Sequence, residues 1–372
     1  MRIIYVPRSD AHIVSGGDVL HANLLQQSLN FIDVEIESVY AESLHKYSRA
    51  DAIYLTQIYQ IADVEIVAAW ARRTCTPLFI CPLFDEGLRM EFRLTLRGRG
   101  NWHRLSKLLG KRLAGNLFVS QQTSVRSRQE LWQRQRAILQ QAHIITNTYY
   151  ELEHLRKWFK LENPNFTIIP LGIDSNVFNP NAGSDWENLP EQVKGLRGSY
   201  LLQVGLISER KNQIGLLLAM DDSRVPLVFV GRQSPYESEY YKETLGIACA
   251  RGNVVFLDWV SIEALAALYG QAAAHILPSW SERPGLVSLE AAACNCKVVT
   301  SITAPSWEYL GKKNVGLCAP QHTRSIRHAT LQVLDARLPM ELSSYVINRY
   351  SWDNTALAFK KALANVINST VS

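Results

Sequence analysis

The residues best able to do chemistry lie between positions 278 and 301, in the string PSWSERPGLVSLEAAACNCKVVTS. Closely spaced Pro, Ser and Gly residues predict a loop in its first part. Residues 286–294 are rich in Ala and Leu and predict a helix. The stretch 297–300, with three β-branched residues after a Lys, predicts a buried strand, as does the apolar run 274–277. This order is typical of a parallel sheet, whose ligands bind at the carboxyl ends of strands.

Two carboxylates belong to this stretch, Glu282 in the loop and Glu290 in the helix. A helix that begins near Pro284 presents unpaired N–H groups and a positive dipole end, which favour phosphate. The carboxylates on either side could accept hydrogen bonds from sugar hydroxyls. The alternative is a pair of exposed surface glutamates, but Leu289 and the alanines 291–293 surround Glu290 with apolar residues.

Two adjacent cations, Arg210 and Lys211, occur in the string GLISERKN at residues 205–212. A buried strand is predicted before them at 200–204, and a helix is predicted after them at 213–220. Two cations at such a strand–helix junction predict an anion site. The alternative is a basic pair on the surface.

A glycine pair, Gly16 and Gly17, lies between a predicted strand at residues 3–6 and a predicted helix at 19–29. Glycines let the backbone approach a ligand closely, so this order outlines a phosphate-approach loop. A simple turn is the alternative interpretation.

Predicted strands and helices alternate along the rest of the chain, which predicts an α/β fold with parallel sheets. The chain of 372 residues is long enough for two domains. A polar stretch at 181–198, rich in Asn, Gly, Pro and charge, predicts the linker. We therefore expect an N-terminal domain at 1–180 and a C-terminal domain at 199–351.

Composition excludes several classes of protein. No apolar run reaches the length of a membrane span, and the N-terminal residues lack a signal-peptide layout. The six cysteines form no CxxC pair, so we interpret them as reduced core thiols of a cytosolic protein and expect no zinc site. We expect a cytoplasmic protein.

Positive charge is concentrated between residues 86 and 140, which contain 12 Lys or Arg against 3 Glu. Apolar residues of this window fall on one helical face, and basic residues lie around them: Trp102, Leu105, Leu108, Leu109 and Leu113, with Arg104, Lys107, Lys111 and Arg112. Through such a helix, the basic region 89–136 could bind an anionic membrane surface, at the inner face of the membrane. A core-facing helix with a solvated basic side is the alternative. No nucleic-acid motif accompanies the charge, so nucleic acid is not expected as a partner.

Together these motifs resemble the retaining GT-B glycosyltransferases of glycosyltransferase family 4, also called glycosyl transferases group 1. The donor motif of that family has two Glu with seven residues between them, followed by a small-residue helix and a Val-rich strand. The matching segments here are Ser281-Glu282, Gly285-Leu286-Val287, Leu289-Glu290-Ala291 and Val298-Val299. The string FTIIPLGIDSNVFNP at 166–180 resembles the segment that closes the first domain of the family.

The chain also departs from the family pattern. Arg283-Pro284 replaces the usual Gly-Phe, and Leu206 stands where many members have Arg. The family commonly has a His after the strand that ends near Cys81, whereas Asp85 and Glu86 are the nearest polar residues here. We leave open whether either carboxylate replaces that His.

The resemblance implies two Rossmann-like domains facing across a cleft, with a C-terminal helix at 352–372 that crosses back to the first domain. It implies that a nucleotide sugar of UDP or GDP type is donor, with no metal and no further cofactor. Catalytic roles fall on Arg210, Lys211 and Glu282. Donor contacts fall on Gly16, Gly17, Gly205, Arg232, Val260, Gly285, Leu286, Val287 and Glu290.

The expected acceptor is a glycan, a lipid-linked glycan or a small molecule, in polysaccharide or glycolipid biosynthesis. Three alternatives remain open. A hydrolase could use the two carboxylates, although it would have no diphosphate for the basic pair to hold. The others are a non-catalytic nucleotide-sugar-binding subunit and a sugar-nucleotide epimerase of similar architecture.

Overall fold

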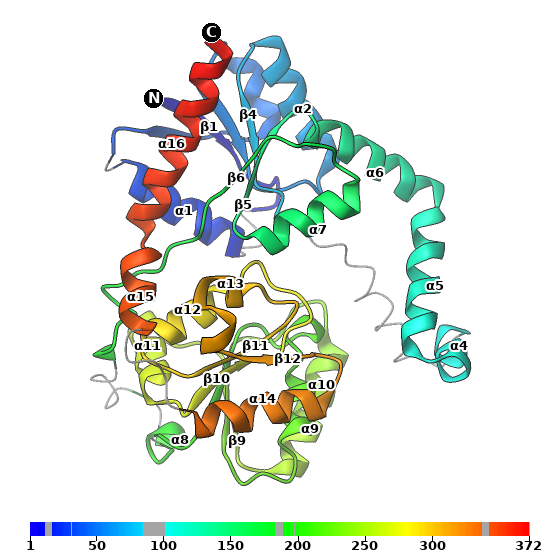
Figure 1. Ribbon diagram of the computed structural model, residues 1–372, viewed down its shortest axis with the longest axis vertical. Helices are drawn as coiled ribbons and strands as arrows, with labels where there is room; N and C mark the ends of the chain where they lie inside the picture. The colour runs from blue at the N-terminus through cyan, green and yellow to red at the C-terminus, as the bar shows by residue number, and fades with distance from the viewer. Residues whose placement is uncertain are drawn as a thin grey trace. The chain divides into compact units, whose positions relative to one another are not determined.

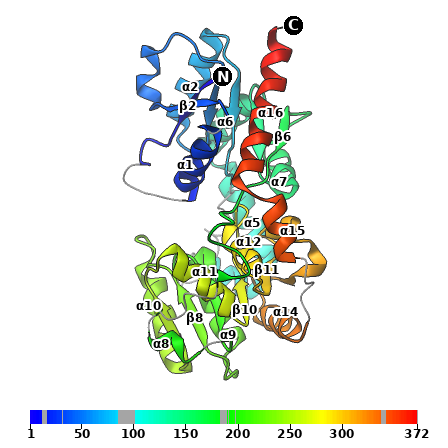
Figure 2. The same cartoon turned by 90° about the vertical axis from the view of Figure 1, so that its left-hand side faces the viewer.

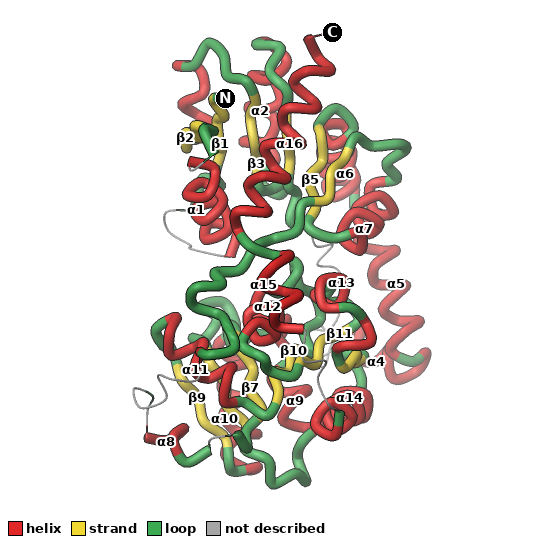
Figure 3. The backbone as a smooth tube through the Cα atoms, turned by 60° about the vertical axis from the view of Figure 1, so that its left-hand side comes forward, coloured by secondary structure: helices red, strands yellow, loops and turns green. Residues whose placement is uncertain are grey.

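A computed structural model of the chain describes residues 1–11, 17–30, 32–84, 101–182, 189, 191–196, 198–336 and 342–371. The chain forms two compact units (Figure 1). The first comprises Met1–Pro170 with Trp352–Ser372, and the second comprises Leu171–Ser351. Both contain a parallel six-stranded sheet with helices packed around it, as Figure 3 shows, so the predicted two-domain α/β architecture is confirmed.

The sheet of the first unit has the strand order β2-β1-β3-β4-β5-β6. Its strands are β1 (Arg2–Val6), β2 (Glu35–Ser38), β3 (Ala52–Leu55), β4 (Leu78–Ile80), β5 (His143–Thr146) and β6 (Phe166–Ile168). The central strands are buried on both faces because helices cover them, and this explains their nearly continuous apolar sequences. Ile4, Ile53, Ile80 and Ile144, one from each of four neighbouring strands, are fully buried in one core cluster.

The helices of the first unit follow the predicted alternation with the strands. They are α1 (Gly17–Asn30), η1 (Ala41–Lys46), α2 (Ile61–Arg73), α4 (Asn101–Leu109), α5 (Lys111–Ser124), α6 (Arg126–Leu139), α7 (Tyr149–Phe159) and α16 (Trp352–Val371). Helix α7 begins at Thr148 because the hydroxyl of that residue accepts a hydrogen bond from the N–H of Glu151. Among the described helices, none is both long and apolar enough to cross a lipid bilayer.

The C-terminal helix α16 returns to the first unit, as predicted, and packs against α1 (Figure 2). Phe359 lies edge-on to Tyr54 with ring centroids 4.9 Å apart, and both side chains are fully buried. Lys360 Nζ donates a hydrogen bond to the carbonyl oxygen of Ile32 at 2.6 Å. Residues distant in sequence therefore complete the core of this unit.

The sheet of the second unit has the order β12-β11-β10-β7-β8-β9. Its strands are β7 (Leu201–Val204), β8 (Leu227–Val230), β9 (Val254–Leu257), β10 (Ala274–Leu277), β11 (Val298–Ser301) and β12 (Gly316–Cys318). This is the strand order of the doubly wound dinucleotide-binding fold. Its first and fourth strands are neighbours, and the strands that follow each of them are added on opposite sides of this pair. Here those strands are β7 and β10, so ligands are expected at their carboxyl ends.

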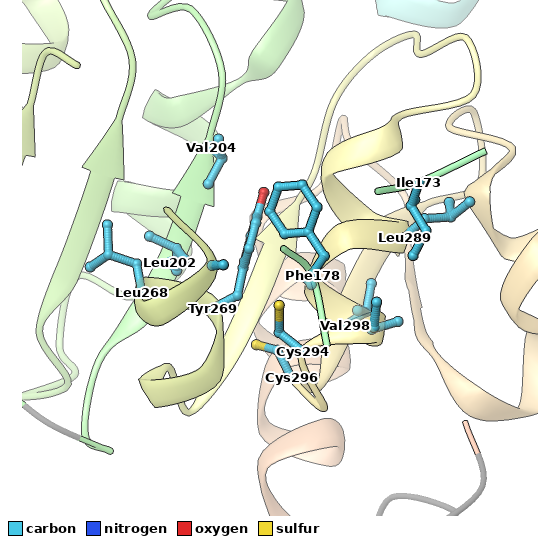
Figure 4. Close-up of a cluster of buried hydrophobic side chains, with 14 of the residues drawn as sticks. Ile173, Phe178, Leu202, Val204, Leu268, Tyr269, Leu289, Cys294, Cys296 and Val298 are labelled. Atoms are coloured by element: carbon cyan, nitrogen blue, oxygen red, sulfur yellow. The ribbon is translucent and has the colours of Figure 1, made fainter. Parts of the chain in front are cut away.

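The helices of the second unit surround this sheet. They are α8 (Glu191–Lys194), η3 (Glu209–Lys211), α9 (Gln213–Ala219), α10 (Ser238–Arg251), α11 (Ile262–Gln271), α12 (Leu286–Ala293), α13 (Ser306–Leu310), η4 (Lys312–Asn314), α14 (Thr323–Asp335) and α15 (Leu342–Arg349). One face of the sheet packs on a core in which Tyr269 from α11 lies against Phe178, with ring centroids 6.1 Å apart (Figure 4).

The predicted domain end at residue 180 falls inside the second unit. Ile173 pairs with Ser351, and Phe178 is buried in the second core. The segment expected to be a linker, 181–198, contains α8 within its described part, and Leu189 and Val193 are buried in the same core. The polar residues of this stretch give it the composition of a linker, but its few apolar side chains pack into the core of the second unit.

Two sequence expectations need correction. The cysteines were all expected in the core, but Cys75 and Cys249 are exposed, whereas the other four are buried and all six are free thiols.

The single amphipathic helix expected around Leu108 is two helices, α4 and α5, because Gly110 between them has a φ of +80°. Left-handed backbone interrupts an α-helix, and glycine adopts it without strain.

Candidate active site

The two charged loops predicted from the sequence meet at the carboxyl ends of β7 and β10. The first loop follows β7 and contains Arg210 and Lys211 in η3. The second follows β10 and contains Glu282. The backbone joins them directly, since Trp280 N–H donates to the carbonyl oxygen of Arg210 at 2.8 Å, and an Arg210 guanidinium N–H donates to the carbonyl oxygen of Ser281 at 2.9 Å.

The centre of this site is a three-residue charge cluster. Glu282 Oε1 lies 2.8 Å from Lys211 Nζ, and Glu282 Oε2 lies 3.2 Å from an Arg210 guanidinium nitrogen. The side chains of Lys211 and Glu282 are buried, whereas that of Arg210 is 40% exposed. Two cations and one carboxylate leave a net positive charge, so the cluster can attract an anion that approaches along Arg210.

The pKa values follow from burial and pairing. Burial alone would raise the pKa of Glu282, but the charges of Lys211 and Arg210 outweigh it and bring the pKa down to about 2. Burial lowers the pKa of Lys211, and the charge of Glu282 opposes that change. Each partner is therefore held in its charged form mainly by the other.

Gly205 makes room for this cluster. Its φ is +134°, and a Cβ on this residue would lie 2.7 Å from Lys211 Cε. Any side chain here would displace the lysine stem, which explains a glycine directly after β7.

Two amides that the sequence analysis did not select hold η3 in place. The side-chain amide of Asn212 donates to the carbonyl oxygens of Pro278 and Pro320, both at 3.0 Å. The backbone of Asn212 is left-handed, with a φ of 59°. The Gln203 amide, inside β7, donates to the carbonyl oxygen of Lys211 at 2.6 Å. A polar residue within the buried strand LLQV was the sequence signal for Gln203, and an Asn directly after the basic pair was the signal for Asn212.

Helix α12 begins beside Glu282. Gly285 is its N-cap, with left-handed φ of +89°, and Leu286 and Val287 form the first turn. N–H groups of a first turn have no partner within the helix. The predicted helix start is thus confirmed, and its positive dipole end lies next to the charge cluster.

Glu290 lies one helical turn further along α12 and is half-buried. Burial raises the pKa of Glu290 to about 7, while a hydrogen bond from Tyr269 and the charge of Lys211 oppose the increase. The Tyr269 hydroxyl donates to Glu290 Oε2 at 3.3 Å from the fully buried ring shown in Figure 4. Tyr269 was missed because its place in an apolar helix resembles that of any core residue.

The remaining predicted donor contacts lie along the same edge of the sheet or outside the described residues. Arg232 is exposed just after β8, and its carbonyl oxygen accepts a hydrogen bond from Ile207 N–H at 2.9 Å. Val260 is half-buried after β9. In the other unit, Gly17 is the first residue of α1. Gly16, Asp85 and Glu86 lie outside the described residues.

The arrangement has the chemistry to bind an anion at a topological switch point. Cations, a helix N-terminus and close-packed glycine backbone favour phosphate oxygens, and the two carboxylates favour hydroxyl groups. Across the described parts of the chain, no group of three or more His, Cys, Asp or Glu side chains lies close enough together to hold a metal ion.

Comparisons with known proteins agree with this reading of the fold. The sequence model of the family described as glycosyl transferases group 1 matches residues 184–349. A D-inositol 3-phosphate glycosyltransferase from Acidothermus cellulolyticus is 26% identical over 57% of this chain and 50% of its own length. An O-antigen chain mannosyltransferase B from Escherichia coli is 30% identical over 42% of this chain and 43% of its own length. The chain spans about half the length of these curated relatives.

A solved structure shows the same fold over almost the whole chain. The Anabaena protein HepE, crystallised in complex with UDP, superposes with a TM-score of 0.72 at 15% identity, covering 98% of this chain and all of its own. At this identity the likeness establishes the two-domain GT-B architecture.

Proposed function

The chain belongs to the glycosyl transferases group 1 through residues 184–349, and on that premise we propose that it transfers a sugar from a nucleoside-diphosphate donor to a hydroxyl group of an acceptor. The observation that carries the proposal is the Arg210–Lys211–Glu282 cluster beside the start of α12. Diphosphate is the anion whose size and charge match two adjacent cations next to a helix N-terminus.

In the proposed reaction, the bond between the sugar C1 and a diphosphate oxygen breaks, and C1 bonds to the acceptor oxygen. The acceptor proton passes to the released phosphate, so the products are a glycoside and a nucleoside diphosphate. Lys211 and Arg210 stabilise the negative charge that grows on the leaving diphosphate, as do the N–H groups of Leu286 and Val287. No metal ion is required in this scheme, because the cations of the chain supply that charge.

The carboxylates orient the donor. Glu282 accepts a hydrogen bond from a hydroxyl of the transferred sugar while it remains paired with Lys211. Glu290 accepts from the ribose hydroxyls, and the Tyr269 hydroxyl holds its carboxylate in place. Arg232 and Val260 border the base. Glu282 is engaged by two cations and is therefore a weak nucleophile, which disfavours a glycosyl-enzyme intermediate. Retention of configuration then requires the acceptor hydroxyl to attack the face of the sugar from which the diphosphate leaves.

Names of similar proteins support finer proposals. The complex of HepE with UDP supports a donor of UDP type, and GDP is the second base to test. The mannosyltransferase that acts on O-antigen chains supports a glycan acceptor and a role in polysaccharide biosynthesis.

The direct test incubates the protein with radiolabelled UDP-, GDP- and ADP-sugars and measures release of nucleotide and free sugar. Slow donor hydrolysis that disappears in Lys211→Ala supports the proposal, and NMR of the product with an acceptor tests retention. EDTA should leave the rate unchanged. A chelated enzyme that recovers only after a divalent ion is added would contradict the metal-free scheme.

One observation favours a second candidate, a subunit that binds nucleotide sugar without turnover. Leu206, at the position where many family members have Arg, is 47% exposed beside the anion site. A thermal-shift panel of UDP, GDP, ADP and their sugar conjugates separates the two candidates, because a ligand of the native state raises the melting temperature whether or not it reacts. Binding of a sugar nucleotide that is never hydrolysed or transferred would favour the second.

A further inference from the structure

Helices α4 and α5 of the first unit form a hairpin with a small core of its own. Ala114 and Phe118 of α5 are buried, and Trp102 and Leu105 of α4 pack against them. The rings of Trp102 and Phe118 meet edge to face, with centroids 5.2 Å apart. In Figure 1, α5 leads away from the end of α6 and α4 lies beside its far end. The inner faces of the two helices are thus already occupied.

A second apolar set lies on the outside of this hairpin. Leu108 is 80% exposed and Leu113 is 58% exposed, on either side of the Gly110 turn. Leu109 and Leu117 are exposed at 40% and 48%. We call these four residues the leucine tip. Leu113 and Leu117 are four positions apart and therefore share a face of α5. Leu108, Leu109 and Leu113 lie within three residues of Gly110, and exposed leucines grouped in this way differ from single apolar residues scattered over a surface.

The charge of the hairpin is one-sided. Residues 101–124 contain Arg104, Lys107, Lys111 and Arg112 and no Asp or Glu. Arg104 and Lys107 are exposed. The next helix differs, because Arg126 there pairs with Glu130 at 3.0 Å. Positive charge without a carboxylate therefore coincides with the leucine tip.

We propose that the α4–α5 hairpin docks on the surface of an anionic lipid bilayer. The leucine tip enters the boundary between headgroups and acyl chains, and Arg104 and Lys107 bind lipid phosphates. A second copy of the chain fits poorly, because two hairpins of like charge would repel each other. Nucleic acid would satisfy the cations and leave the leucines in water. A lipid surface satisfies both sets.

Docking on lipid is independent of the donor site. The residues of the leucine tip lie in the first unit, whereas Arg210, Lys211 and Glu282 lie in the second. Variants of the hairpin should therefore keep donor hydrolysis and donor binding, so a failure of the lipid proposal leaves the proposed function intact, and the converse holds.

The test is sedimentation of the full chain with vesicles of phosphatidylglycerol and phosphatidylcholine in equal parts, and with vesicles of phosphatidylcholine alone. We expect the protein to pellet with the anionic vesicles at low salt and to be released at about 1 M salt, where the Debye length falls to about 3 Å. Arg104→Ser with Lys107→Ser should weaken partitioning about 25-fold, which is about five-fold for each charge or about 1 kcal/mol. Leu108→Ser with Leu113→Ser should weaken it roughly ten-fold or more.

Matched controls separate the hairpin from the rest of the surface. Leu218→Ser with Leu331→Ser removes two leucines of the second unit that are 50% and 42% exposed. Lys157→Ser with Lys361→Ser removes two exposed lysines elsewhere in the first unit. Both control variants should bind vesicles as the unmodified protein does. All four variants change exposed residues, so unchanged melting temperatures check that they fold.

Several outcomes would overturn the proposal. The unmodified protein could remain in the supernatant at low salt with anionic vesicles. The control variants could lose binding as much as the hairpin variants do. Light scattering could instead show a dimer that Leu108→Ser with Leu113→Ser dissociates while vesicles never bind, which would make the leucine tip an interface between two copies.

Discussion

Lys211 Nζ and Glu282 Oε1 lie 2.8 Å apart in the second unit, and less than one-tenth of either side chain is exposed to solvent. The pair joins the loop after β7 to the loop after β10. A buried charge is tolerated only when it is paired, so each residue depends on the other for its ionisation. Four predictions test this site.

The charge of Lys211 should matter more for the rate than for folding. Lys211→Met keeps a flexible stem beside Gly205 and removes the charge. Because Arg210 still lies 3.2 Å from Glu282, the carboxylate keeps one partner. We expect kcat for transfer or donor hydrolysis to fall about 10²–10³-fold, as when one preorganised charge contact to a developing anion is lost. Steady-state kinetics and thermal melts measure both effects, and Lys157→Met, an exposed lysine, is the control. Near-normal rates in both Lys211→Met and Arg210→Ala would show that the diphosphate binds elsewhere.

Glu282→Gln should lower kcat more than it changes the donor KM, because contacts to the sugar tighten as positive charge develops on the ring. It should also alter acid stability. The folded pKa of Glu282, about 2, is below its unfolded value near 4.5, so its contribution to stability is present above pH 4.5 and is lost as the pH falls towards 2. Urea unfolding at several pH values should show a flatter acid limb in Glu282→Gln. An unchanged limb would mean that Lys211 does not hold this carboxylate ionised.

Glu290 should make donor binding depend on pH near neutrality. Only its ionised form accepts hydrogen bonds from both ribose hydroxyls at full strength, and its pKa is about 7. The donor KM should therefore fall as the pH rises through 7, and Glu290→Gln should raise KM and remove that dependence while kcat changes little. The contribution of Glu290 to stability changes in the opposite sense. Because its folded pKa is raised, this contribution is complete below pH 4.5 and is lost as the pH rises from 4.5 to about 7. Tyr269→Phe, which keeps the ring, should shift the KM profile to higher pH, because the hydroxyl lowers the pKa. If Glu290→Gln retains the KM profile of the unmodified protein, another group titrates.

Gly205→Ala should impair the site through geometry. The new Cβ would lie 2.7 Å from Lys211 Cε, and a φ of +134° strains any residue with a side chain. We expect a stability loss of about 1–3 kcal/mol and a fall in kcat. Gly246→Ala in α10 is the matched control, since a Cβ there meets nothing within 4 Å and alanine favours helix by about 1 kcal/mol over glycine. Equal effects of the two substitutions would remove the special role of Gly205.

Much of the second unit could be predicted because its signals are local. The strands AHIL and LVFV are short apolar runs next to turn residues, and the structure places β10 and β8 there. Ser261 begins α11 by accepting a hydrogen bond from Ala264 N–H, a contact that spans three residues. The expected start of α12 after Gly285 is also confirmed, since it depends only on neighbouring residues. By contrast, the break between α4 and α5 was missed because the apolar spacing continues across Gly110.

Periodicity, turn chemistry and motif spacing act over a few residues, so the sequence alone predicts the two parallel sheets, the two charged loops and the match of residues 184–349 to glycosyl transferases group 1. The three-dimensional fold is needed to show that Arg210 donates to the carbonyl oxygen of Ser281, 71 positions away, and that Glu282 lies between two cations. Strand β10 pairs directly with β7 although β8 and β9 come between them in the sequence, and no local pattern encodes that adjacency. The pKa values of Glu282 and Glu290 follow from the same adjacency, because burial and distant partners set them.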